Sequence, residues 1–235
     1  QGLRNDITIN TGTLTNIFGA KIIAQKGSLS ITTTVGDLLN SGELFADKDV
    51  TLISAKNLNN SGKIGGENIT ITATSGKFEN YGKIAAVKKL LVHVNNLINA
   101  GTPEEISKYL TAFNTFVQEN YDNVVKIIDE LNKKLDSMVD TNEIEALESI
   151  LEYYKNLERE LSTLKYEVER VGALGILSGN EVELKSNTDI LNNGIVKSET
   201  TAKLEATNNI NNSGVVEGSI DVTLKAGGDI TNTQR

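Results

Sequence analysis

Stretches in which apolar and polar residues alternate recur about every twenty residues along most of the chain. Ile69, Ile71 and Ala73 alternate with threonines, and Val50 and Leu52 flank a threonine in the same way. Strict alternation is typical of a strand that buries one face and exposes the other. Two shorter apolar segments separate each such stretch from the next. Each repeat is therefore predicted to contain three short strands.

An Asn-x-Gly motif marks one corner of most repeats, where glycine and asparagine suit the tight turn. The asparagines of this series are 20, 20, 19, 93, 20 and 20 residues apart. A fixed period of this size predicts a solenoid, in which each repeat packs only on its neighbours. We expect the asparagines to stack into a ladder of amide hydrogen bonds, as in cross-β stacks, with isolated Asx turns as the alternative. The series comprises Asn40, Asn60, Asn80, Asn99, Asn192, Asn212 and Asn232.

The first repeat follows the pattern less closely. Leu14-Thr-Asn16 precedes Gly19, and Asn16 lies 24 residues before Asn40. We interpret this part as one coil with a longer corner. As a whole, the pattern predicts a mainly β fold, with parallel β-helix coils of about 20 residues over 1–101 and again over 175–235.

Residues 102–174 interrupt the repeats with a different pattern. Apolar residues here recur every three or four positions in two long runs, which is typical of amphipathic helices. Thr102, Pro103 and Glu105 match a capping box with a proline at the first helical position. Gly172 follows the second run. We predict helices over about 103–138 and 142–171.

Both ends of this insertion must meet at a single corner of one coil. The chain therefore has to go out and come back, and an antiparallel helical hairpin does so while burying both apolar stripes. At 1.5 Å per residue, each helix would extend about 45–50 Å.

The net charge of the chain lies entirely on the insertion. Residues 102–174 contain 16 acidic and 8 basic residues, a net charge of −8, and the remaining 15 acidic residues are balanced by 15 basic ones. Nucleic acid is not expected as a partner, because phosphate binding needs a basic face. The acidic insertion favours either a basic partner surface or a plainly solvated helix face. No apolar run is long enough to predict a membrane-spanning segment.

The repeats resemble the haemagglutinin-type repeats of filamentous haemagglutinin and related two-partner-secretion exoproteins. The matching units include Leu58-Asn-Asn-Ser-Gly-Lys-Ile-Gly-Gly, Ile210-Asn-Asn-Ser-Gly-Val-Val-Glu-Gly and Val222-Thr-Leu-Lys-Ala-Gly-Gly-Asp-Ile. The resemblance implies a right-handed parallel β-helix, export by an outer-membrane transporter, and a fibre on the surface of a Gram-negative bacterium. That family includes adhesins and the stalks of contact-dependent growth-inhibition effectors. The insertion is outside the repeat pattern, so no role is carried over to it.

Candidate catalytic and metal-binding residues are few. Alternation places His93, the single histidine, on the outside of a strand, and the chain has no cysteine with which to build a zinc site. Asp47, Asp49, Glu67 and Glu79 fall near corners of successive coils, but they do not share one repeat position, as a carbohydrate-cleaving groove would require. We therefore expect no enzyme, no cofactor, and no catalytic, cofactor-binding or metal-binding residue.

Aromatic residues point to the insertion as a binding element. Tyr109, Phe116, Tyr153 and Tyr166 fall beside the narrowest helical seam, and exposed aromatic residues are favoured interface anchors; a wider helix–helix stripe is the alternative. The leading hypothesis is a structural shaft segment of a secreted surface fibre, whose hairpin binds a cell-surface protein or glycan. The alternatives are a purely mechanical spacer or fibre-bundling module, and the stalk of a toxin-delivery protein.

Overall fold

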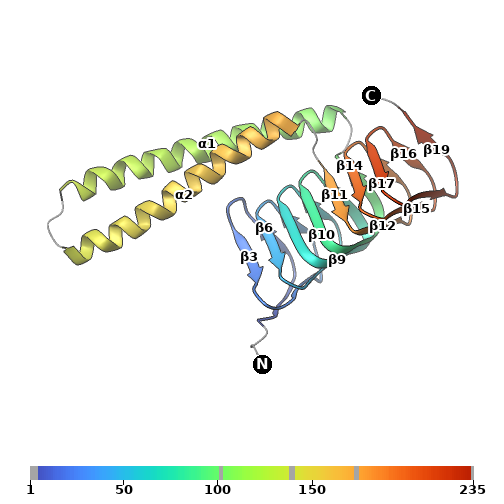
Figure 1. Ribbon diagram of the computed structural model, residues 1–235, viewed down its shortest axis with the longest axis horizontal. Helices are drawn as coiled ribbons and strands as arrows, with labels where there is room; N and C mark the ends of the chain where they lie inside the picture. Colours follow the sequence, from blue (N-terminus) through green and yellow to red (C-terminus); the bar gives the residue numbers. More distant parts are fainter. Residues whose placement is uncertain (1–4, 101–102, 138–140, 172–174, 234–235) are drawn as a thin grey trace. The chain divides into compact units, whose positions relative to one another are not determined.

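The computed structural model describes residues 5–100, 103–137, 141–171 and 175–233 (Figure 1). It divides into two compact units, which are the repeats (1–103 with 173–235) and the inserted segment (104–172). The repeats form one sheet of 19 strands, and each coil pairs in parallel with the next. The predicted fold class, a mainly β parallel β-helix interrupted by helices, is confirmed.

Three columns of strands make up the β-helix. The longest strand of each coil shows the predicted alternation of inward apolar and outward polar residues; these strands are β1 (Ile7–Thr11), β4 (Leu29–Thr33), β7 (Asp49–Ser54), β12 (Glu181–Ser186), β15 (Thr201–Ala206) and β18 (Asp221–Ala226). A second column of short strands ends in the asparagines: β2 (Leu14–Asn16), β5 (Leu38–Asn40), β8 (Leu58–Asn60), β13 (Ile190–Asn192), β16 (Ile210–Asn212) and β19 (Ile230–Asn232). The third column follows the corner: β3 (Lys21–Ala24), β6 (Glu43–Ala46), β11 (Ile176–Gly179), β14 (Ile195–Ser198) and β17 (Val215–Gly218).

Two central coils differ from the expected three short strands. β9 (Lys63–Asn80) and β10 (Lys83–Asn99) each run through all three columns as one continuous strand. Their corners have nearly equal lengths, so the pairing between the two coils continues around the bends and is interrupted only by register shifts between Ala86 and Lys89 and between Val94 and Asn96. Bulges of this kind let a paired strand turn a corner.

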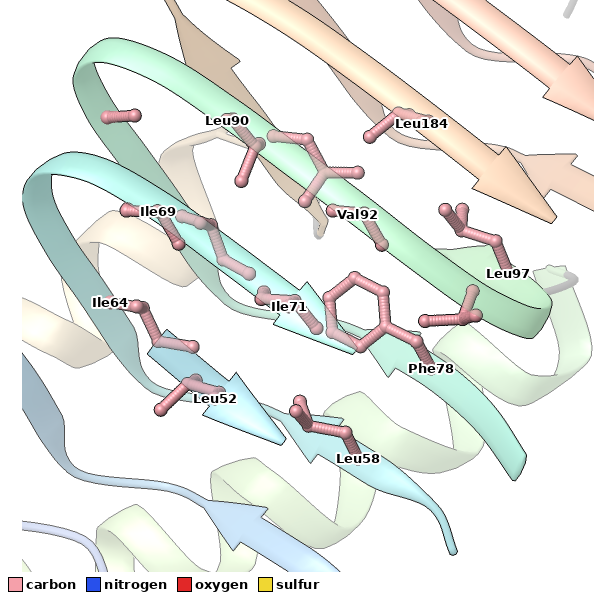
Figure 2. Close-up of a cluster of buried hydrophobic side chains, with 14 of the residues drawn as sticks. Leu52, Leu58, Ile64, Ile69, Ile71, Phe78, Leu90, Val92, Leu97 and Leu184 are labelled. Atoms are coloured by element: carbon pink, nitrogen blue, oxygen red, sulfur yellow. The ribbon is translucent and has the colours of Figure 1, made fainter. Parts of the chain in front are cut away.

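The core is a narrow column of stacked aliphatic side chains along the inside of the coils (Figure 2). Leu52, Ile71 and Val92 occupy equivalent positions in successive coils and are 0% exposed. Phe78 fills the same column as Leu58 and Leu97. Because like residues stack on like at one strand spacing of about 4.8 Å, each coil covers the apolar face of its neighbour.

The insertion forms two helices, α1 (Pro103–Leu135) and α2 (Thr141–Val171), which lie side by side and antiparallel (Figure 1). α1 begins at the proline expected at the first helical position and ends slightly before the predicted 138. The Tyr121 hydroxyl donates a hydrogen bond to Glu158 Oε1 (3.2 Å) across the pair. Val117 and Leu161 are each 1% exposed between the helices. The predicted cap Thr102 and the predicted glycine stop Gly172 lie outside the described residues.

Candidate functional site

Stacked asparagine side chains run the length of the β-helix as one chain of hydrogen bonds. Asn40 Nδ2 donates to Asn60 Oδ1 (2.7 Å), and Asn60 Nδ2 donates to Asn80 Oδ1 (2.8 Å). The amide dipoles point the same way in every coil, so the bonds polarise one another. The remaining links, all within hydrogen-bonding distance, are Asn16–Asn40, Asn80–Asn99, Asn99–Asn192, Asn192–Asn212 and Asn212–Asn232.

Asn16 belongs to this ladder, although the sequence series began only at Asn40. Asn16 Nδ2 donates to Asn40 Oδ1 at 2.8 Å. The irregular length of the first coil concealed it, because 24 residues separate these two asparagines. The remaining signal was the motif Leu-x-Asn, which Leu14-Thr-Asn16 shares with β5 and β8.

Glycine follows the ladder residue because the turns of successive coils touch. A Cβ on Gly62 would lie 2.0 Å from the carbonyl oxygen of Gly42, and one on Gly82 would lie 2.1 Å from that of Gly62. The Gly62 amide donates to the Asn40 carbonyl at 3.1 Å. Glycine is therefore required here for close approach of backbones rather than for unusual dihedral angles.

The insertion opens one of these turns between its first residue and its glycine. Ala100 takes the place of Ser61 or Tyr81, and its amide donates to the Asn80 carbonyl (2.9 Å). Gly175 takes the glycine position, because its carbonyl accepts the Ile195 amide (2.9 Å), as the Gly62 carbonyl accepts an amide of the next coil. The turn glycine assigned from the sequence, at position 101, lies outside the described residues.

The two ends of the insertion meet, and both take left-handed backbone conformations. Ala100 has a φ of 65° and Gly175 a φ of 78°. A Cβ on Gly175 would lie 2.7 Å from the Ala100 amide nitrogen. A left-handed alanine costs about 1–2 kcal/mol, so the corner pays a small local cost to admit the insertion.

The register of the β-helix continues unchanged across the insertion. Leu90 pairs with Val182, and Val92 pairs with Leu184, so inward residues meet inward residues. Asn99 Nδ2 donates to Asn192 Oδ1 at 2.7 Å, although 93 residues separate them. The insertion therefore interrupts the sequence of the repeats and leaves their hydrogen bonding intact.

A second column of Asx residues supports the coils three positions before the ladder, and sequence reasoning missed it. The Asn57 amide donates to Asp37 Oδ1 (3.0 Å), and the Asp229 amide donates to Asn209 Oδ1 (2.9 Å). Asp189 Oδ1 likewise accepts the Asn209 amide (3.0 Å). Its signal was an aspartate or asparagine directly before the apolar residue that begins the asparagine-bearing strand.

Lysine and glutamate side chains form a charged lattice on the outer face of the coils around and after the insertion. Lys89 Nζ lies 2.8 Å from Glu181 Oε1 and 3.2 Å from Glu183 Oε2, and Lys185 Nζ lies 2.9 Å from Glu183 Oε1. Hydrogen bonding from Lys185, and then from Lys89, lowers the pKa of Glu183. Bonding to Glu181 raises the pKa of Lys89. These pairs link the coils on either side of the insertion.

The carboxylates considered for catalysis are each engaged by a different neighbour. Asp47 accepts the Lys26 backbone amide (2.7 Å), Asp49 accepts the side-chain amide of Asn68 (2.8 Å), and Glu67 pairs with Lys88. Glu79 pairs with the lysine two positions before it. Among the described residues, no three histidine, cysteine, aspartate or glutamate side chains gather to hold a metal ion.

The single histidine is a surface residue. The side chain of His93 is exposed, with Nε2 3.2 Å from the Asn187 side-chain oxygen.

On the hairpin, Tyr153 is the one aromatic candidate whose side chain the structure describes. It is 62% exposed, and its ring meets that of Tyr154 edge to face at 5.3 Å. The side chains of Tyr109, Phe116 and Tyr166 lie outside the part described. No helix in the described ranges is long and apolar enough to cross a membrane.

Comparison with known proteins identifies the repeats. The haemagglutinin repeat family matches residues 4–102 and 172–234, which together make up most of the chain. No curated protein and no solved structure matched the sequence. Proteins of this family are structural, adhesin-type exoproteins of two-partner secretion, carried to the surface of Gram-negative bacteria. The chain belongs to the haemagglutinin repeat family and is an adhesin-like shaft segment.

Proposed function

We propose that the hairpin inserted in this shaft is a recognition module, and that it binds a protein or glycan on a cell surface. The observation that carries the proposal is the continuity of the asparagine ladder, from Asn99 to Asn192, past the insertion. Because the ladder passes directly from the coil before the insertion to the coil after it, we look for the role of the insertion outside the shaft. Export of the whole by an outer-membrane transporter is part of the same proposal and follows from the family.

The surface chemistry of the hairpin supports a binding role. Ile150 and Tyr153 are 47% and 62% exposed on α2. Apolar and aromatic side chains that stay exposed on a folded module are favoured anchors for a partner.

The test is binding of the fluorescently labelled protein to intact bacterial and host cells, with and without residues 101–174. Joining Ala100 directly to Gly175 rebuilds a turn like Asn80-Tyr-Gly82. Saturable binding that disappears with the hairpin is the expected result. Equal binding by both forms would move recognition to the coils.

Alanine variants then locate the binding residues. Alanine at Tyr109, Phe116, Tyr153 or Tyr166 is expected to weaken cell binding while the helical circular dichroism signal stays constant. Loss of helicity instead would assign that residue to the helix–helix contact.

A further inference from the structure

The corner between β13 and β14 carries a chemically reactive pair of residues. Asn193-Gly194 is the only Asn-Gly dipeptide in the chain. At the equivalent corner of two other coils a serine precedes the glycine, in Ser61-Gly62 and Ser213-Gly214. Glycine has no side chain to shield its backbone nitrogen. The nitrogen of Gly194 can therefore reach the side-chain carbonyl carbon of Asn193 once the backbone is free to move.

The reaction open to this pair is loss of the side-chain amide. The Gly194 nitrogen gives up its proton and attacks Cγ of Asn193, the bond from Cγ to the amide nitrogen breaks, and ammonia leaves. The product is a cyclic imide. Water then opens this ring at either carbonyl and leaves an aspartate, or an isoaspartate whose backbone runs through the side-chain carbon.

The folded corner engages both reacting groups in hydrogen bonds. The Gly194 amide donates to the Asn99 carbonyl (3.2 Å), and the Asn193 amide donates to the same oxygen (2.9 Å). The Asn193 side-chain oxygen accepts a hydrogen bond from the Ser213 hydroxyl of the next coil. Attack requires the Gly194 nitrogen to lose the proton that it donates to Asn99. The corner has to open first, so the population of the open corner limits the reaction.

The stack of turns has no room for the isoaspartate product. A Cβ on Gly214 would lie 2.1 Å from the Gly194 carbonyl oxygen and 2.7 Å from the Asn193 carbonyl carbon. The next turn therefore lies directly against the segment that isoaspartate lengthens by a backbone atom. Just past this segment, the Ile195 amide donates to the Gly175 carbonyl (2.9 Å), where the chain returns from the insertion. The longer backbone displaces Ile195 from this bond.

This corner is also expected to close late during folding. It stacks on the turn that the insertion opens, and the ladder bond beside it joins Asn99 to Asn192, which are 93 residues apart. Contacts between residues far apart in sequence form slowly, because the entropy of closing the loop opposes them. The pair is therefore exposed to the reaction for longer than a corner between coils about twenty residues apart would be.

We propose that Asn193 is a modification site controlled by folding. It is stable in the closed coil and converts to isoaspartate in a chain whose coils are still open. The modified chain then cannot close the coil that follows the insertion, so unfolding becomes irreversible by chemical modification of the unfolded state. The inference concerns the shaft and does not depend on the proposed recognition role of the hairpin.

Incubation of the whole protein at mildly alkaline pH, in native buffer and in guanidinium chloride, tests the control by folding. Peptide mapping by mass spectrometry follows the conversion at Asn193. Because a reaction through an open state scales with the population of that state, we expect conversion in the folded protein to be at least about tenfold slower than in the unfolded chain. Equal rates in the two conditions overturn the proposal. So does an unfolded chain that converts Asn193 no faster than Asn192, which is followed by asparagine.

Two substitutions separate the modification from its effect on folding. Asn193→Ser restores the Ser-Gly corner of the neighbouring coil and cannot form the imide, so it is expected to refold fully after the same incubation. Asn193→Asp has the charge of the product with an unchanged backbone, and it is expected to refold like the parent before incubation. Failure of Asn193→Asp to refold would assign the loss to charge and contradict the proposal.

Refolding of the incubated parent is the final readout. As isoaspartate accumulates at Asn193, the fraction that regains its β-sheet circular dichroism signal after removal of guanidinium chloride should fall in proportion. Refolded protein that contains as much isoaspartate as the fraction that stays unfolded would overturn the proposal.

Discussion

The coils and the hairpin solve the same problem, the burial of an apolar face, to different degrees. In the coils, Leu52, Ile71 and Val92 are 0% exposed, because a neighbour covers each residue from both sides along the stack. In the hairpin, α2 packs along α1, and Ile150 and Tyr153 stay exposed. A coil in the middle of the stack has a neighbour on both sides of its core, whereas each helix of the pair buries a single stripe against the other. This difference is the reason why we propose the hairpin, rather than the coils, as the recognition element.

The same substitution in the two regions is expected to give the largest contrast. Leu52→Ala should lower the free energy of unfolding of the coils by about 4–5 kcal/mol, since the stacked core cannot collapse into the cavity. Leu161→Ala, at 1% exposure in the hairpin, should cost only about 2 kcal/mol, near the lower end of the same range, because two helices relax more easily. Hydrogen exchange followed by mass spectrometry measures both regions at once. Equal losses of protection in the two regions would show that the cores are equally rigid.

Removing one asparagine of the ladder is expected to give the second largest loss of free energy of unfolding. Asn60→Ala removes a fully buried side chain and leaves the Asn40 donor and the Asn80 acceptor without their partners. At about 1–3 kcal/mol per unsatisfied buried group, the loss should be about 2–4 kcal/mol by urea denaturation. Asn59→Ala, on the outward side of the same strand, is the control and should cost below about 1 kcal/mol. Similar costs for both would mean that the ladder contributes little.

Glycine substitutions separate close approach from mere flexibility. Gly62→Ala places a methyl group 2.0 Å from the Gly42 carbonyl oxygen, whereas at Gly12 a Cβ would meet nothing within 4 Å. The first change should destabilise the coils by about 1–3 kcal/mol or more. The second should be close to neutral in melting temperature. If Gly12→Ala were the more damaging of the two, stacking of the turns would not explain the glycines.

The charged lattice is expected to give the smallest effect, with a defined pH dependence. Because Glu183 has its pKa lowered in the folded protein by Lys185 and Lys89, its contribution is complete above its unfolded pKa of about 4.3. The contribution is lost as the pH falls through the lower folded value. Glu183→Gln should therefore be less stable than the parent at neutral pH, by at most about 1 kcal/mol. Thermal melts across the acidic range should show this difference vanish; a constant difference would assign it to packing.

Much of this architecture follows from the spacing of a few residue types. Alternation and the asparagine period are enough to predict the coils and the position of the insertion, and apolar residues three or four positions apart predict its two helices. The Asn-x-Gly motif assigns the glycine of the opened turn to Gly101, because the sequence does not show which residue returns to the corner after the insertion. Closure of the coil selects Gly175, through its bond to Ile195.

Two further features escaped prediction for a similar reason. Asn16 was hidden by an irregular coil length. The column that contains Asp37 and Asp189 uses side chains to accept backbone amides of the next coil, and such contacts appear only once the coils are stacked. The sequence places Tyr153 beside the helical seam, but its exposed fraction of 62% depends on how much of α2 the partner helix covers.

The most direct test of the account is the stability of the shaft after the hairpin is removed. The form with Ala100 joined to Gly175 should keep its β-sheet circular dichroism signal and melt cooperatively. Its melting temperature should equal or slightly exceed that of the coils in the parent, because Ala100 is released from its left-handed conformation. A form that fails to fold, or whose coils melt well below those of the parent, would contradict the claim that the β-helix folds and is stable without the hairpin.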